Sequence, residues 1–114
     1  MYKDWPKMAA ELTTLMGDTR KGIPETWGGF SAMAKHSTAA GALDPKTKEL
    51  IATGIGIAVR CDGCIAFHVK AAIQQGATRE EMLETVGMGL YMGGGPSAVY
   101  GAMAMEAFDQ FAAQ

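Results

Sequence analysis

The chain has 114 residues, of which 10 are basic and 12 acidic, and its formal net charge is −2. This length predicts a single domain spanning residues 1–114, and the near balance of charges excludes the basic surface that nucleic-acid binding requires. Two cysteines are too few for a disulfide scaffold. No apolar run is long enough to span a bilayer, and the opening stretch MYKDWPKM lacks the apolar segment of a secretory signal. We therefore expect a cytoplasmic protein with no membrane partner.

Helical periodicity extends through the first half of the chain, and the alternation typical of strands is missing. A first amphipathic helix is expected over residues 4–17. Pro24 suits the first turn of a second helix that would extend to about residue 40. Asp44 followed by Pro45 is a typical helix start and predicts a third helix that ends near residue 60.

The second half continues in the same way and gives an all-α domain of about six helices. A fourth helix should begin near residues 61–63 and end at Gly76. Thr78 and Glu81 have the spacing of a capping box and predict the start of a fifth helix. The stretch GGGPS at 93–97 separates this helix from a last one over about residues 96–112. This last helix is apolar with few charges, which favours self-association over a central place in a monomer.

The stretch CDGCIAFH, residues 61–68, carries the chemistry. Cys61, Cys64 and His68 are spaced i, i+3 and i+7, so they share one face at the start of a helix. The positive end of the helix favours thiolate over thiol, and a thiolate is the form that attacks a peroxide or a disulfide. Two thiols one turn apart can then close and reopen a disulfide. Asp62 is expected to serve as the N-terminal cap of this helix.

Three other interpretations of this stretch remain open at this point. A thioredoxin-like dithiol fits the CxxC spacing, but no βαβ pattern surrounds it. Catalytic zinc fits two thiols and one histidine with an open fourth position. Alternatively, the cysteines are small apolar side chains in a helical core.

Glu49 extends the pattern, because it precedes Cys61 by twelve positions while His68 follows Cys64 by four. With this signature the region from about residue 43 to 111 resembles the alkylhydroperoxidase (AhpD-like) branch of the carboxymuconolactone decarboxylase family. The resemblance implies a single AhpD-like helical domain with a CxxC-bearing helix hairpin. It also implies a homo-oligomer, either a trimer or a hexamer, and a thiol-dependent peroxidase or disulfide reductase. Neither a cofactor nor a metal is expected.

The roles of four residues follow from this resemblance. Cys64 would attack a hydroperoxide substrate, and Cys61 would resolve the product. His68 would take the proton, and Glu49 would orient the histidine or recharge the relay. An external dithiol or a lipoyl-type reductant would restore the thiols. The best-known members carry a histidine just before the second cysteine, where this chain has Gly63, so a relay through that position is lost.

The position of Glu49 needs a geometric test. In one straight helix it would lie about 18 Å from Cys61, at ~1.5 Å per residue, so the chain must reverse between them and the site. A reversal near Cys61 would place Glu49 beside residue 73, about one and a half turns beyond His68. We therefore expect a water molecule, rather than direct contact, to connect the two side chains.

Two further functions are compatible with the sequence. A cofactor-free lyase of the decarboxylase branch would use His68 and Glu49 as acid and base and would not need the sulfurs. A non-enzymatic redox-sensing protein would use the disulfide as a switch, reacting once without turnover.

Overall fold

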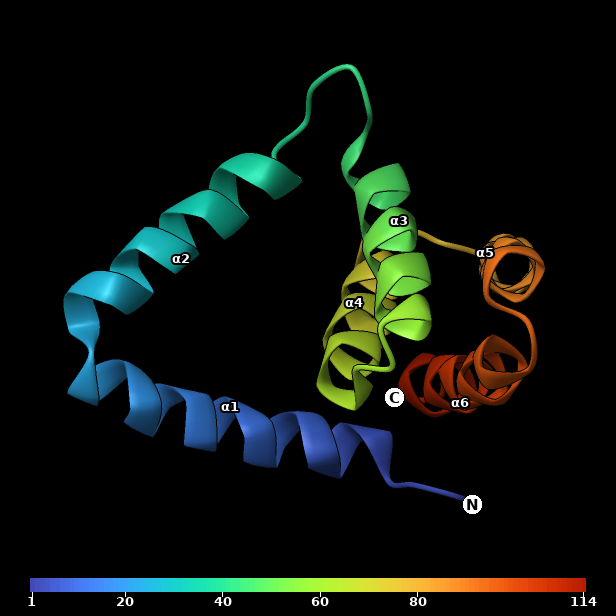
Figure 1. Ribbon diagram of the computed structural model, residues 1–114, viewed down its shortest axis with the longest axis horizontal. Coiled ribbons are helices and arrows are strands. Elements are labelled where there is room, and N and C mark those ends of the chain that lie inside the picture. Colours follow the sequence, from blue (N-terminus) through green and yellow to red (C-terminus); the bar gives the residue numbers. More distant parts are fainter.

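The computed structural model describes all residues, 1–114, and consists of six helices without a strand (Figure 1). The helices are α1 (Trp5–Gly22), α2 (Pro24–Thr38), α3 (Pro45–Ala58), α4 (Asp62–Gln74), α5 (Arg79–Gly93) and α6 (Gly95–Ala112). The predicted all-α fold is therefore confirmed. None of these helices combines the length and the apolar character needed to cross a bilayer.

Helix starts follow the capping residues of the sequence. The Asp44 side chain accepts a hydrogen bond from the Thr47 N–H at 2.7 Å, and Pro45 occupies the first turn of α3. At the start of α5, the Thr78 hydroxyl accepts from the Glu81 N–H while the Glu81 carboxylate accepts from the Thr78 N–H. Both bonds of the predicted capping box are thus present, and they satisfy backbone donors that a helix end leaves free.

The last helix has more buried residues than any other helix. Its inward face supplies Met103, Ala104, Ala107, Phe108 and Phe111 to the hydrophobic core. These apolar side chains are occupied inside the chain, because α6 packs against α5 and α4. The outer side of α6 exposes Ala98, Val99 and Ala102, so the expected self-association of this helix stays a prediction that would use this outer face.

The first two helices form an open arm around one side of the α3–α4 pair (Figure 1). The inner end of α1 is anchored by Trp5, which is fully buried, whereas α2 buries no residue at all. On α2, Phe30 is 53% exposed and Met33 is 60% exposed. Trp27 meets Phe30 edge to face within the same helix, at 6.0 Å between ring centroids. Most of the arm therefore lacks a hydrophobic partner within the chain.

A clasp of hydrogen bonds holds the N-terminal segment against α6. One carboxylate, that of Glu106, accepts from the backbone N–H groups of Tyr2 and Lys3 at 2.6 and 2.9 Å and from the Trp5 indole N–H at 2.8 Å. Gln110 accepts from the Trp5 N–H at 2.8 Å and donates to the Lys3 carbonyl at 2.7 Å. The Lys3 backbone is thereby fixed at both its donor and its acceptor.

We expect this clasp to open on acidification. The N–H groups of Tyr2 and Lys3, followed by the Trp5 indole, hold the pKa of Glu106 below its ordinary value of 4.5. Because the pKa of Glu106 is lower in the folded state, the charged carboxylate stabilises the fold above pH 4.5. This stabilisation is lost as the pH falls through the folded-state pKa. Fluorescence of Trp5, recorded in a Trp27→Phe background, should change below about pH 4.5 before the helices unfold. Glu106→Gln cannot titrate and should remove this early step; an identical acid transition in both proteins would contradict the assignment.

Candidate active site

The turn between α3 and α4 places Cys61 beside the end of α3. The Cys61 N–H donates to the Gly56 carbonyl at 3.0 Å, and the Arg60 N–H donates to the Ile57 carbonyl at 3.2 Å. These two bonds, with Arg60 at φ 59°, make a Schellman motif that ends α3. The turn usually favours glycine at the left-handed position, because a side chain is disfavoured there. The chain reverses within three residues and begins α4 immediately.

Cys61 and Cys64 are joined in a disulfide at the first turn of α4. Their Cα atoms are 5.2 Å apart, and the Cys61 Sγ atom also accepts a hydrogen bond from the Cys64 N–H at 3.1 Å. Cys61 is therefore the N-cap of α4, and the expectation that Asp62 fills this role is wrong. Asp62 is the first helical residue instead, and its carboxylate pairs with Lys3. Both sulfurs thus lie at the positive end of a helix, as the sequence predicts.

Glu49 and His68 are in direct contact across the α3–α4 interface. The His68 Nδ1 atom lies 2.7 Å from the Glu49 Oε2 atom. Glu49 is only 7% exposed, whereas the His68 side chain is 35% exposed. The expected water bridge is therefore wrong. The buried carboxylate holds one ring nitrogen of the histidine, and the other, Nε2, has no hydrogen-bond partner within the chain.

The Schellman turn explains why these two residues meet. Its hydrogen bond sets Cys61 level with Gly56, not with the very end of α3. Glu49 precedes Gly56 by seven positions, and His68 follows Cys61 by seven positions. Two helical turns in each direction bring the side chains to the same height and to the same face. The sequence-based estimate took Cys61 itself as the pivot and so placed Glu49 too far along α4.

Two glycines allow close packing around the cysteines, and sequence reasoning missed both roles. A Cβ atom at Gly56 would lie 3.2 Å from the Cys64 Cβ atom, so α3 approaches α4 closely at the second cysteine. A Cβ atom at Gly63 would lie 3.0 Å from the Leu12 Cδ1 atom of α1. A side chain at this position would require the Leu12 side chain to shift. Gly63, at the position where the best-known family members have histidine, therefore leaves room for Leu12 of α1.

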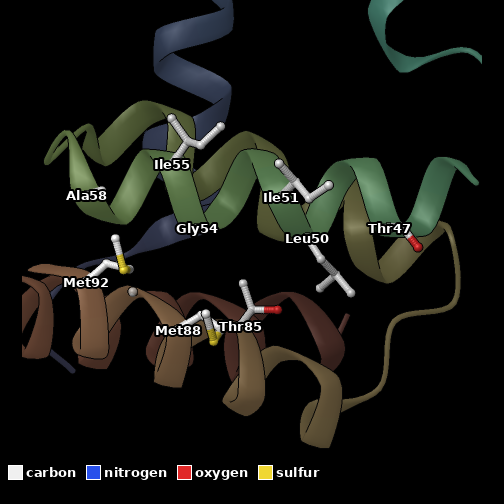
Figure 2. A pocket seen from close by; sticks show the side chains of 10 residues that line it. Thr47, Leu50, Ile51, Gly54, Ile55, Ala58, Thr85, Met88 and Met92 are labelled. Carbon is white, nitrogen blue, oxygen red and sulfur yellow. The ribbon is translucent and has the colours of Figure 1, made fainter. Parts of the chain in front are cut away.

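The four candidate residues lie apart from the apolar groove between α3 and α5. This groove has a volume of about 390 Å³, and Figure 2 shows Leu50 pointing from α3 towards α5 while Met88 and Met92 point from α5 towards α3. None of Glu49, Cys61, Cys64 and His68 lines it. A second cavity of about 280 Å³ lies inside the α1–α2 arm. Phe67, which directly precedes His68, lines that second cavity.

The structure brings together the sequence-predicted residues as two neighbouring pairs: the disulfide of Cys61 with Cys64, and the contact of Glu49 with His68. No group of three or more histidine, cysteine, aspartate or glutamate side chains is arranged to hold a metal ion. The paired Lys3 and Asp62, together with Arg60, are the additional charges at the thiol turn. Lys3 carries no signal in the sequence, because it is separated from Asp62 by 59 positions.

Comparison with known proteins defines the class of this fold and site. The profile of the carboxymuconolactone decarboxylase family matches residues 24–107. The chain therefore belongs to the carboxymuconolactone decarboxylase family. The alkylhydroperoxidase branch within it is consistent with the Cys61–Cys64 disulfide, but the match itself names only the family.

Particular relatives extend over nearly the whole chain. A family member from Legionella pneumophila of known structure is 50% identical, with a TM-score of 0.91, over 94% of this chain and 96% of that one. An uncharacterised protein from Cupriavidus necator is 33% identical over 96% of both chains, and an uncharacterised protein of the cox locus of Paracoccus denitrificans is 33% identical over 92% and 91%. A family structure from Thermotoga maritima shares the fold, with a TM-score of 0.84 at 24% identity over 93% of this chain and 91% of that one.

Proposed function

We propose that this protein is a thiol-dependent peroxidase of the alkylhydroperoxidase type that also reduces disulfides. The observation that carries the proposal is a disulfide at the start of α4, one helical turn before a histidine that a buried carboxylate holds. A dithiol alone serves many functions. A dithiol next to an oriented base has what a peroxidase needs: a nucleophile, a resolving sulfur and a proton carrier.

The proposed cycle starts from the reduced protein. His68 takes the proton of Cys64, and the resulting thiolate attacks the terminal oxygen of a hydroperoxide. The O–O bond breaks, the sulfenic acid forms on Cys64, and the departing alkoxide takes the proton from His68 and leaves as an alcohol. The Cys61 sulfur then attacks the sulfenic sulfur, the S–O bond breaks, and hydroxide leaves with the Cys61 proton as water.

An external dithiol closes the cycle. Its two thiols reduce the Cys61–Cys64 disulfide by exchange and are oxidised to a disulfide themselves. The net reaction converts one hydroperoxide and one dithiol into an alcohol, water and a disulfide. A small dithiol or a lipoyl-type group supplies the required chemistry. Since the cycle depends on reducing equivalents, we place it in the cytoplasm.

Glu49 acts on the histidine and not on the sulfur. An ionised carboxylate only accepts hydrogen bonds, so at 2.7 Å it favours the tautomer that carries the proton on Nδ1. The Nε2 atom of His68 then stays free to accept the thiol proton. His68 follows Cys64 by four positions on the same helix, which is the spacing of side-chain neighbours.

The comparisons support this function without naming it. An antioxidative role has been suggested for the Thermotoga maritima family member, and detoxifying a hydroperoxide is a reaction of that kind. The cavity beside Phe67 has room for the organic part of a hydroperoxide, and its wall combines the apolar Met16 and Trp27 with the polar Thr13 and Arg20. An apolar substituent would have contact surface there that hydrogen peroxide cannot use.

The test is intact mass after one equivalent of organic hydroperoxide is added to the fully reduced protein. Closure of the disulfide removes two hydrogens, so each chain should lose about two mass units. Added dithiol should restore the original mass and sustain hydroperoxide consumption over many turnovers. An unchanged mass would refute the peroxidase function. A single oxidation without turnover, with any dithiol tested, would indicate the redox-sensing alternative.

The lyase alternative uses the same Glu49–His68 pair and follows from membership of the family. An acid–base pair of this kind can move a proton next to a carboxylate in a cyclic lactone acid without any sulfur. Alkylation of both cysteines separates the two functions. The peroxidase should lose its activity on alkylation, whereas a lyase should retain decarboxylation of its lactone.

We also propose that the chain forms a homo-oligomer, either a trimer or a hexamer. Several surfaces expose large apolar side chains, among them the arm, the outer face of α6 with Val99, and the α3–α5 groove of Figure 2, where Ile55 is 58% and Met92 is 76% exposed. Apolar surface of this extent usually marks an interaction site. Light scattering should give a mass of three or six chains, and Ile55→Glu should lower it; a monomer at micromolar concentration would contradict the proposal.

A further inference from the structure

The N-terminal segment delivers a positive charge to the thiol turn. The Lys3 ammonium donates to the Asp62 carboxylate, and Asp62 lies between the two cysteines in the chain. The hydrogen bond with Asp62 raises the pKa of Lys3 above its ordinary value, so the lysine stays charged at neutral pH. The same ammonium lies 5.8 Å from the ring centroids of both Tyr2 and Trp5.

The position of Lys3 is defined by contacts far from the thiols. Its backbone N–H is bound by Glu106 and its carbonyl by Gln110, both on α6. Trp5, two residues further on, is fully buried and bonded to the same two side chains. The side chain therefore extends towards Asp62 from a fixed backbone, which reduces the entropy that an exposed lysine usually loses when it pairs.

Asp62 has opposing effects on the thiols. A carboxylate in the first turn of a helix stabilises the helix through its dipole. The same negative charge opposes the formation of a second negative charge on a neighbouring sulfur. A cation on the carboxylate keeps the helix contact and cancels the repulsion.

We infer that Lys3 is a positioning residue for the thiol pair: it neutralises Asp62 and thereby keeps the thiolate form of Cys61 and Cys64 accessible at neutral pH. Lys3 contacts neither substrate nor sulfur in this arrangement and acts only through Asp62. The inference deepens the proposed function and rests on it for its biological purpose. The change in thiol ionisation that it predicts can be measured whether or not the protein turns over peroxides.

The remaining titratable groups around the turn come from every element packed there. They are His68 on α4, Glu49 on α3, Arg60 in the turn, and Tyr2, Tyr100 and Glu106 near Lys3. Glu49 and His68 are paired with each other. Asp62 is consequently the acidic group that lies next to the cysteines. A single substitution at Lys3 leaves the charge of Asp62 without its partner.

The experiment measures the pH dependence of iodoacetamide alkylation of Cys64 in reduced Cys61→Ser protein. The chain has two cysteines, so Cys64 is the only thiol in this variant. Lys3→Gln should move the midpoint of the profile up by about 0.5 pH unit, because a unit charge several ångströms away in partly aqueous surroundings has an effect of this size. Asp62→Asn should move it down. The double variant should lie close to the parent, and Lys3→Arg should restore the parent profile.

Lys7→Gln is the matched control, because it removes an equal charge from an exposed lysine on α1. A merely structural role of Lys3 would not give shifts of opposite sign for the two partners. An unchanged midpoint in Lys3→Gln, a similar shift in Lys7→Gln, or shifts of the same sign for Lys3→Gln and Asp62→Asn would each overturn the inference. If Lys3→Gln failed to fold, Asp62→Asn would decide by the direction of its shift. No peroxide is involved, so a failed peroxidase assay leaves this result intact.

Discussion

Replacing Cys64 with serine should abolish hydroperoxide turnover, and replacing Cys61 should abolish it as well, at a different step. A serine hydroxyl at position 64 stays protonated near neutral pH and is a far weaker nucleophile than a thiolate, so attack should slow by at least about 10³-fold. In Cys61→Ser the attack remains possible, but the sulfenic acid has no sulfur to condense with. The steady-state rate of hydroperoxide loss with excess dithiol measures both effects.

A sulfenic-acid trap separates the roles of the two cysteines. Cys61→Ser, treated with one equivalent of hydroperoxide, should retain one oxygen on Cys64 and form the trapped adduct. Cys64→Ser should form none. The reverse pattern would mean that Cys61 is the attacking residue, and turnover in the double variant at the parent rate would exclude the cysteines from the reaction.

Removing the charge of Glu49 should have the second-largest effect. Glu49→Gln keeps the size of the side chain, but its amide can donate to Nδ1 of His68 and so favour the opposite tautomer. Loss of an oriented base typically costs about 10²-fold or more, and we expect a decrease of this size in the rate of Cys64 oxidation at neutral pH. His68→Ala should have a comparable effect and should flatten the pH dependence of the rate.

Glu84→Gln is the control for this substitution, because Glu84 is an exposed acid on α5 with no side-chain partner. It should leave oxidation unchanged. Combining Glu49→Gln with His68→Ala should slow oxidation no further than His68→Ala alone, because the carboxylate acts through the imidazole. Additive effects of the two substitutions would show that Glu49 acts on the sulfur by another route.

The sequence predicted the parts of this protein whose signals are local. Helix starts at Asp44 and Thr78 follow from side chains that bond to backbone groups three positions away, and the structure confirms both. The candidate residues on one face of α4 also follow from helical spacing alone. These predictions needed no knowledge of how the helices pack.

The errors concern contacts between elements. The level of Glu49 against α4 depends on whether the turn pivots at Gly56 or at Cys61, and an arginine in a left-handed conformation gives no signal of a Schellman turn. The clasp joins residues separated by more than 100 positions, beyond the range of any periodicity. Whether an apolar helix face packs inside the chain or stays exposed depends on its neighbours, which is why the extent of burial of the inner face of α6 and the exposure of α2 were not anticipated.

Cys61 takes part in two helix ends through different atoms: its N–H completes the end of α3, and its sulfur caps the start of α4. Oxidation state and helix termination are therefore properties of the same residue. A sulfur that changes its covalent partner also changes the quality of a helix cap, so each redox step alters the local stability of the hairpin that holds Glu49 against His68. In this protein one residue, Cys61, both forms the disulfide and connects the two helices of the hairpin.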